Sequence, residues 1–178
     1  MRNFKIFSLK CPITFAAGYS IDKGTLSLEE DVVAAYQSIS RALRVLIVDD
    51  ESIYRTGLVS QLTRTSELTK ALELTQANGS SAALQAFTDH DFDLIITDVD
   101  MGEISLDGFE LVSELRRRGS KALICLHSNR TIGADNKNAS KSGADTFVPK
   151  PASHAQLLRL VLQAASAVKA ATPSPGVL

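Results

Sequence analysis

The chain lacks the features that mark several specialised classes of protein. It has no tryptophan, only two cysteines among 178 residues, and a formal net charge of −1. A chain with so few cysteines is not expected to have a disulfide framework, which favours a reducing compartment. The near-neutral charge gives no electrostatic basis for binding nucleic acid. No run of residues approaches the roughly 20 apolar residues of a membrane-spanning helix, so we expect no membrane partner.

The amino-terminal residues are faintly similar to a secretion signal, because the basic stretch Met1–Lys5 precedes the mainly apolar stretch Ile6–Leu9. Lys10 and Pro12 interrupt the apolar core that such a signal needs. We therefore expect a cytoplasmic protein.

A regular alternation of apolar runs and amphipathic stretches begins at Arg44. The expected strands are Val45–Val48, a stretch within 70–76, Leu94–Thr97, Ala122–Leu126 and Thr146–Val148. The expected helices are 52–62, 81–87, 108–118, 131–142 and a last helix capped by Ser153. The first of these helices has helical spacing through Ile53, Leu58 and Leu62. Five strands that alternate with helices predict a parallel sheet in a three-layer α/β/α domain.

The regions outside this alternation are interpreted separately. Residues 1–42 are predicted to be an amino-terminal extension with a helix at 27–40, which Ser27 and Glu30 begin as a capping box. This helix is either a leader folded onto the domain, or a linker or dimerising helix. Residues 43–168 are predicted to form the globular domain and 169–178 a flexible tail.

Polar residues follow four of the five predicted strands. Asp49 and Asp50 follow the first strand, Asp98 the third, Ser128 the fourth and Lys150 the fifth. The carboxyl ends of parallel strands meet at one edge of the sheet. Carboxylates crowded there would repel one another, and a hard cation such as Mg²⁺ relieves that repulsion. The lysine can hold an anion and the serine can donate a hydrogen bond, which together suit transfer of a phosphoryl group onto a carboxylate.

Each of these residues has an ordinary structural explanation when it is taken alone. An acid after a strand commonly caps a helix, and a lysine before a proline is commonly solvated. The basic run 116–118 is likewise interpreted as the solvated last turn of a helix. Only the occurrence of the whole polar set at successive strand ends makes the signal specific.

With this set in view, the chain resembles the response-regulator receiver domains of two-component signalling. The stretch Val45–Glu51 is similar to the opening strand and acidic pair of that family. Asp98 stands at the phosphoacceptor position, Ser128 at the Ser/Thr position and Lys150-Pro151 at the Lys-Pro position. The separations of 30 residues between Asp98 and Ser128, and 22 between Ser128 and Lys150, are usual for the family. Gly143-Ala144-Asp145 resembles the turn before the fifth strand.

The resemblance implies a flavodoxin-like fold over residues 43–168, with the strand order 2-1-3-4-5, and a signalling role rather than an enzymatic one. Asp98 would accept a phosphoryl group from a histidine kinase or phosphotransfer protein, and Lys150 would pair with that group. Ser128 and Phe147 would switch the surface formed by the fourth helix, fifth strand and fifth helix. That surface, or the amino-terminal helix, could form a homodimer.

The resemblance also implies a metal site. Mg²⁺ would be held by Asp50, Asp98 and the main-chain carbonyl of Asp100, with Asp49 reached through water. The Lys150-Pro151 peptide bond is expected to be cis.

The chain departs from the family pattern near the phosphoacceptor. Gly102 stands where the family usually has proline, and the loop between Asp98 and Asp107 is two residues longer than usual. Asn129 replaces a small residue. Asp100 and Arg130 are expected to flank the mouth of the pocket, where an ion pair could control the access of water.

Two other functions are considered. Asp98-Val99-Asp100 resembles the Asp-x-Asp signature of haloacid-dehalogenase-type phosphatases, although that signature normally follows the first strand of its fold and no cap insert is visible here. A degenerate receiver that acts as an interaction scaffold is the other alternative, and the intact polar set argues against it. No output domain is recognised after residue 170, so we expect action through partner binding, or a detached piece of a sensor-kinase assembly.

Overall fold

The computed structural model describes residues 25–39, 41–102, 106–129 and 141–171, with side chains from residue 28 onward. Its centre is a five-stranded parallel sheet with the order β2-β1-β3-β4-β5, which confirms the predicted order. The strands are β1 Leu43–Val48, β2 Leu72–Ala77, β3 Leu94–Thr97, β4 Leu123–Ser128 and β5 Thr146–Pro149. The helices are α1 Thr25–Ile39, α2 Ser52–Leu62, α3 Ser66–Ala71, α4 Ser80–Asp89, α5 Gly108–Arg117 and α7 His154–Ala171.

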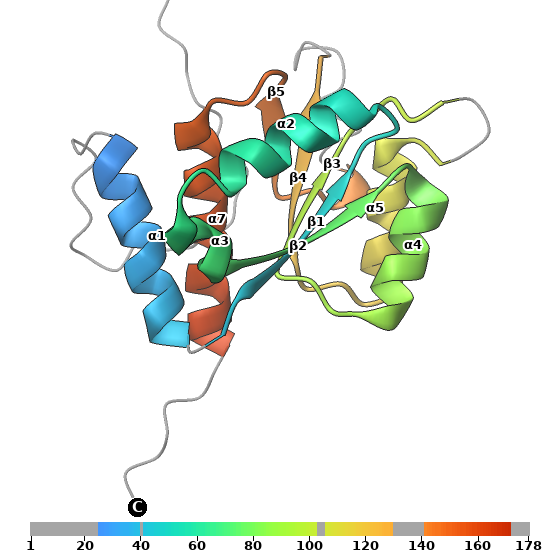
Figure 1. Ribbon diagram of the computed structural model, residues 1–178. Helices are drawn as coiled ribbons and strands as arrows, with labels where there is room; N and C mark the ends of the chain where they lie inside the picture. The colour runs from blue at the N-terminus through green and yellow to red at the C-terminus, as the bar shows by residue number, and fades with distance from the viewer. Residues whose placement is uncertain (1–24, 40, 103–105, 130–140, 172–178) are drawn as a thin grey trace, which may run out of the picture.

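Helices cover both faces of the sheet, as Figure 1 shows. Alternate residues of β1 face opposite sides: Val45 and Ile47 pack with α1, α2, α3 and α7, while Leu46 and Val48 pack with α4 and α5. This arrangement explains why β1 and β3 are apolar at nearly every position, because a parallel strand is buried on both faces. The predicted three-layer α/β/α architecture is confirmed.

Helix α2 has the predicted bounds, but only two of the three apolar residues that gave it helical spacing in the sequence are buried. Leu58 and Leu62 are buried, whereas the Ile53 side chain is exposed by 74%. Five residues separate Ile53 from Leu58, and at 3.6 residues per turn this places the two side chains about 140° apart around the helix. Ile53 therefore points to solvent.

The short helix α3 was not predicted. The Thr65 hydroxyl accepts a hydrogen bond from the Leu68 amide at 3.3 Å and begins the helix, which buries Leu68 and Ala71. Six residues are too few to show a helical period in the sequence. The helix predicted at 131–142 lies outside the described residues, except for its last two positions, which are helical.

Helix α1 packs on α7 and α3, and Figure 1 shows α1 beside α7. It begins at Thr25, two residues before the predicted cap at Ser27. Val32 is fully buried in the core, and a hydrogen bond of 2.7 Å joins Glu29 Oε1 to His154 Nε2 of α7. The amino-terminal helix is thus in direct contact with the rest of the fold.

Helix α7 begins at the predicted cap. The Ser153 hydroxyl accepts a hydrogen bond from the Gln156 amide at 3.3 Å, and the Gln156 side chain accepts one from the Ser153 amide at 2.9 Å. This reciprocal pair satisfies two amides that would otherwise lack partners at the helix start. The helix continues to Ala171, so the first three residues of the predicted tail 169–178 are helical, and the remainder of that tail lies outside the described residues.

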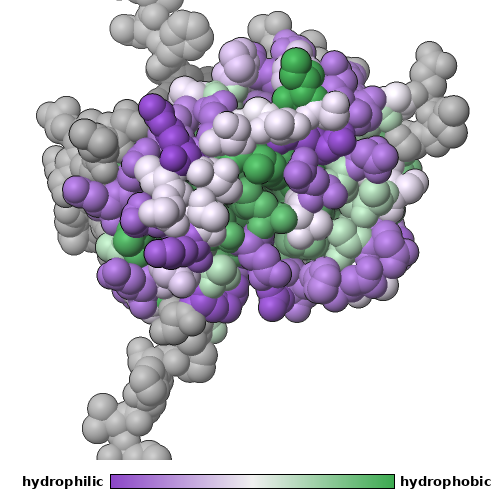
Figure 2. All heavy atoms as spheres, viewed as in Figure 1, coloured by the Kyte–Doolittle hydropathy of each residue, from purple (hydrophilic) through white to green (hydrophobic). Residues whose placement is uncertain are grey.

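Polar side chains dominate the face shown in Figure 2, and a small apolar area lies near its centre, between α2 and β2. Among the described residues, no helix has both the length and the apolar character needed to span a membrane.

Candidate functional site

The end of β1 places one buried carboxylate and one exposed carboxylate side by side. Asp49 is 1% exposed, and its main chain donates to the Ala77 carbonyl at 3.2 Å. The Glu51 amide donates to Asp49 Oδ1 at 2.9 Å, and Arg55 Nη1 donates to the Asp49 carbonyl at 2.5 Å. These bonds hold Asp49 in one orientation, while Asp50 faces solvent.

The end of β3 holds Asp98 just as firmly. Asp98 is 5% exposed, its amide donates to the Val48 carbonyl at 2.9 Å, and its Oδ1 accepts from the Val99 amide at 2.7 Å. The Gly108 amide donates to the Val99 carbonyl at 2.8 Å. A Cβ atom at Gly108 would lie 2.1 Å from the Asp98 carbonyl oxygen, so only glycine fits there. The sequence predicted Gly108 only as the boundary between the loop and the helix 108–118, and gave no sign of this contact.

Lys150 joins the two buried carboxylates. Its Nζ donates to Asp49 Oδ2 at 2.6 Å and lies 2.9 Å from Asp98 Oδ2. The Lys150 side chain is only 2% exposed, and the Tyr54 ring lies over the ammonium with 4.1 Å between Nζ and the ring centroid. The Lys150 amide donates to the Ser128 carbonyl at 3.0 Å, which fixes the chain before the Lys150-Pro151 bond. That bond is cis, as predicted.

Burial and charge act against each other in this pocket. Burial raises the pKa of Asp98 above its usual value, more than the hydrogen bond and charge of Lys150 lower it. Burial alone would lower the pKa of Lys150, but the hydrogen bonds to Asp49 and Asp98 outweigh it and raise the pKa. The lysine therefore stays protonated at neutral pH.

The carboxylates of Asp49, Asp50 and Asp98 meet the requirements of a hard divalent cation. One oxygen from each lies within 4.8 Å of the others. The three carboxylates and the Lys150 ammonium have a formal sum of −2, which a divalent cation would neutralise. Oxygen ligands of this kind suit Mg²⁺.

The other predicted site residues lie around this cluster. Ser128 is 1% exposed at the end of β4, and Phe147 is half-buried against the core on the α4 and α5 side of the sheet. Asp100 and Asn129 are exposed. Arg130, the predicted partner of Asp100, lies outside the described residues.

Gly102 has a φ of +64°. Proline holds φ near −65°, so the residue that the family usually has here is incompatible with this path of the loop. This departure from the pattern is therefore structural, because the backbone at position 102 excludes proline and favours glycine.

His127 is a residue that the sequence did not single out. It lies one position before Ser128 and is 3% exposed, and among the described residues its Nε2 has no hydrogen-bond partner. Burial, together with the nearby charge of Lys150, lowers its pKa to about 4. The imidazole is therefore neutral at physiological pH.

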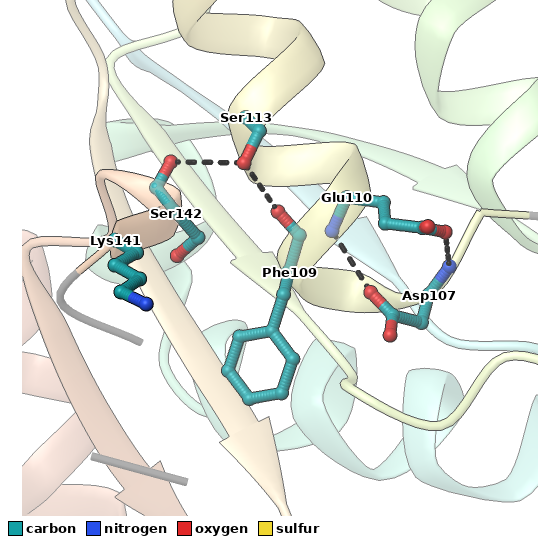
Figure 3. A pocket seen from close by; sticks show the side chains of 6 residues that line it. All are labelled: Asp107, Phe109, Glu110, Ser113, Lys141 and Ser142. Carbon is teal, nitrogen blue, oxygen red and sulfur yellow. Dashed lines mark hydrogen bonds between the residues drawn. The ribbon is translucent and has the colours of Figure 1, made fainter. Parts of the chain in front are cut away.

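Helix α5, which follows the loop after Asp98, is fixed at its start. The Glu110 amide donates to Asp107 Oδ1 at 2.8 Å, and the Asp107 amide donates to Glu110 Oε2 at 3.1 Å. One turn later, the Ser113 hydroxyl lies 2.9 Å from the Phe109 carbonyl and 3.4 Å from the Ser142 carbonyl. Figure 3 shows these residues around a shallow pocket between α5 and the segment before β5. The capping box holds the start of α5, which packs against the Asp98 main chain.

The end of α5 corrects one prediction. Arg116 was predicted to be solvated, but its guanidinium is bound within the fold. It donates to the Gly143 carbonyl at 3.0 Å, to the Ala122 carbonyl at 2.9 Å and to Asp145 Oδ2 at 2.6 Å. Of the predicted basic run, Arg117 fits the solvated description best, with its side chain exposed by 73%. Arg116 thus ties α5 to the turn before β5.

Comparison with known proteins decides the family. The sequence-family model of the response regulator receiver domain matches residues 45–162. The chain belongs to the receiver family. As a receiver, it is a signalling protein rather than a haloacid-dehalogenase-type enzyme, and its family implies a histidine kinase as partner.

The receiver is similar to several regulators and to a sensor protein. It is 37% identical to the probable transcriptional regulator ycf27 of Cyanidium caldarium over 117 residues. The matched segment covers 66% of this chain and 44% of the relative. It is 31% identical to the transcriptional regulatory protein PrrA of Mycobacterium tuberculosis, over 66% of this chain and 48% of the relative. It is 30% identical to the sensor protein GacS of Pseudomonas syringae, over 70% of this chain and 14% of the relative. The chain thus spans half or less of the length of these relatives.

Solved structures agree with the fold. The chemotaxis response regulator CheY4 of Vibrio cholerae is 24% identical with a TM-score of 0.59, over 69% of this chain and 98% of that structure. A receiver domain protein of Methanospirillum hungatei is 18% identical with a TM-score of 0.64, over 74% and 99%. At these identities the likeness shows the fold alone.

Proposed function

We propose that this receiver accepts a phosphoryl group on Asp98 from a phosphohistidine of a histidine kinase or phosphotransfer protein. The observation that carries the proposal is the position of the Lys150 ammonium, which bridges Asp49 and Asp98 beside the carboxylate cluster. A buried nucleophilic carboxylate needs a nearby cation to accept a negatively charged group, and Lys150 supplies one.

The transfer can be written with the residues of this chain. An oxygen of Asp98 forms a bond to phosphorus while the bond between phosphorus and the donor imidazole breaks. The imidazole takes the electron pair of that bond and a proton from solvent. Lys150 balances the charge of the transferred group, and the Ser128 hydroxyl donates a hydrogen bond to it.

The residues present fit a magnesium ion. Asp50, Asp98 and the main-chain carbonyl of Asp100 would hold it. Asp49 already accepts hydrogen bonds on both oxygens, from the Glu51 amide and from Lys150, which supports contact through water rather than direct ligation. When bound, the ion screens the repulsion between the carboxylates and the phosphoryl group.

We further propose that Ser128 and Phe147 pass the change to the surface around β5 and α7. Phosphorylation would bias this surface between two states and so control partner binding or a homodimer. Helix α1 contacts α7 and is proposed to be part of the folded unit, which favours the leader interpretation of residues 1–42 over the linker interpretation.

The test is to incubate the protein with Mg²⁺ and acetyl phosphate and to measure the intact mass. We expect one phosphoryl group on the wild type and none on Asp98→Asn. Asp89→Asn, at the exposed end of α4, is the matched control and should be labelled like the wild type. Wild-type protein that gains no label, and shows no conformational change with beryllofluoride, would favour the scaffold alternative.

A further inference from the structure

We propose that Tyr54 is a positioning residue of the phosphoryl pocket, which holds the Lys150 ammonium against Asp98 and shields it from water. The inference rests on the proposed function of Asp98. It adds to that function a residue of α2 that contacts the lysine and forms no hydrogen bond with either carboxylate. Its basis is the position of the ring relative to the lysine.

The ammonium of Lys150 is nearly enclosed. A lysine ammonium has three N–H donors. Two of them point to carboxylate oxygens, because Nζ lies 2.6 Å from Asp49 Oδ2 and 2.9 Å from Asp98 Oδ2. The Tyr54 ring covers the ammonium at 4.1 Å from its centroid. Together with the two carboxylates, this contact covers the ammonium of a lysine side chain that is only 2% exposed although it lies at the carboxyl edge of the sheet.

An aromatic ring suits this position better than another carboxylate would. The face of the ring attracts a cation through its quadrupole and carries no net charge. A third carboxylate beside Lys150 would repel the incoming phosphoryl group and compete with it for the ammonium. The Tyr54 ring therefore stabilises the charged lysine without weakening its attraction for the phosphoryl group.

The position of Tyr54 follows from the start of α2. The helix begins at Ser52, directly after the acidic stretch 49–51 that follows β1, so its first turn lies beside Asp49 and Lys150. Tyr54 turns inward and is half-buried, whereas the neighbouring Ile53 is exposed by 74%. These two adjacent side chains form a natural pair of test and control positions.

The first experiment measures the exchange of the Lys150 ammonium protons with water by ¹⁵N NMR in the unphosphorylated protein. We expect Tyr54→Leu to speed the exchange about tenfold, which corresponds to about 1.4 kcal/mol for a shielded cation–π contact. Tyr54→Phe keeps the ring face and should stay within about twofold of the wild type. Ile53→Leu, the control on the exposed side, should leave the exchange unchanged.

The second experiment measures the phosphoryl lifetime on Asp98 for the same variants. Tyr54→Leu should shorten the lifetime and slow labelling by acetyl phosphate, and Tyr54→Phe should restore both. Tyr54→Met, which has volume but no ring, replaces the leucine variant if that protein does not fold.

The outcomes separate the two proposals. Two results would overturn the role of the ring: an exchange rate in Tyr54→Leu that equals the wild-type rate, or an exchange rate in Tyr54→Phe that is as fast as in Tyr54→Leu. If the wild-type protein takes no phosphoryl group, the proposed function of Asp98 is overturned. The exchange rates in the unphosphorylated protein would still show whether Tyr54 positions and shields Lys150.

Discussion

A single methyl group at position 108 tests how the loop after Asp98 is packed. In Gly108→Ala the new Cβ would lie 2.1 Å from the Asp98 carbonyl oxygen and 2.7 Å from Val99 Cα, where ordinary contacts begin at 3.4 Å. Both neighbours are main-chain atoms, so the loop or the start of α5 must move by more than 1 Å. Forced packing of this kind costs about 2–3 kcal/mol.

The assay for Gly108→Ala is urea unfolding followed by circular dichroism, with the free energy extrapolated to water. Gly57→Ala in α2 is the matched control, since a Cβ there meets nothing within 4 Å. It should stabilise the protein by roughly 0.5–1 kcal/mol, because alanine favours a helix interior over glycine. The same mutation should thus have opposite signs at the two positions.

The Gly108 contact should also be visible in the chemistry of Asp98. Displacing the Asp98 main chain moves its carboxylate relative to Lys150, so labelling by acetyl phosphate should fall in Gly108→Ala and stay normal in Gly57→Ala. The reasoning would be refuted if Gly108→Ala cost less than about 0.5 kcal/mol, or if both variants were labelled at the wild-type rate.

Two further predictions concern His127 and helix α1. The folded pKa of His127 is about 4 and its ordinary value is 6.5, so between these pH values the unfolded chain binds a proton that the folded protein does not. The free energy of unfolding should therefore fall as the pH drops from 6.5 to 4, by about 3 kcal/mol at most. Urea unfolding curves measured at stepwise pH should show a smaller fall in His127→Leu than in the wild type, and an equal fall would contradict the prediction. Val32→Ala, a buried truncation in α1, should cost about 2 kcal/mol in urea unfolding, whereas Val33→Ala at a half-buried position should cost below about 1 kcal/mol. Equal losses would indicate that α1 does not pack stably on α7.

The sequence was sufficient for the sheet and for the residues at its edge. Parallel strands buried on both faces leave apolar runs such as those of β1 and β3, and their carboxyl ends must meet. Asp49, Asp98 and Lys150 could therefore be brought together before their distances were known. The contacts of 2.6 Å and 2.9 Å from the Lys150 ammonium to Asp49 and Asp98 agree with that placement.

What the sequence could not supply depends on side chains that meet only in the folded protein. Tyr54 and Lys150 are 96 residues apart, and no local pattern relates them. Arg116 looked like its neighbours in a basic run, although in the fold it donates to the carbonyls of Ser120, Ala122 and Gly143. The short α3 carries too few residues for a period, and its start depends on one hydroxyl, that of Thr65.

The unusual loop after Asp98 can be located more closely from its fixed ends. Met101 is 3% exposed in the core, and the Gly108 amide is bound to the Val99 carbonyl, so both sides of the loop are held against β3. These are the fixed ends of the loop, and the two additional residues inferred from the family resemblance fall between them in the sequence. A Cβ at Gly102 would lie 3.8 Å from Asp50 Oδ2, which places this part of the loop beside the exposed carboxylate. If the loop alters the proposed phosphorylation kinetics, we therefore expect it to act through Asp50 and access to the candidate metal site rather than by displacing Asp98.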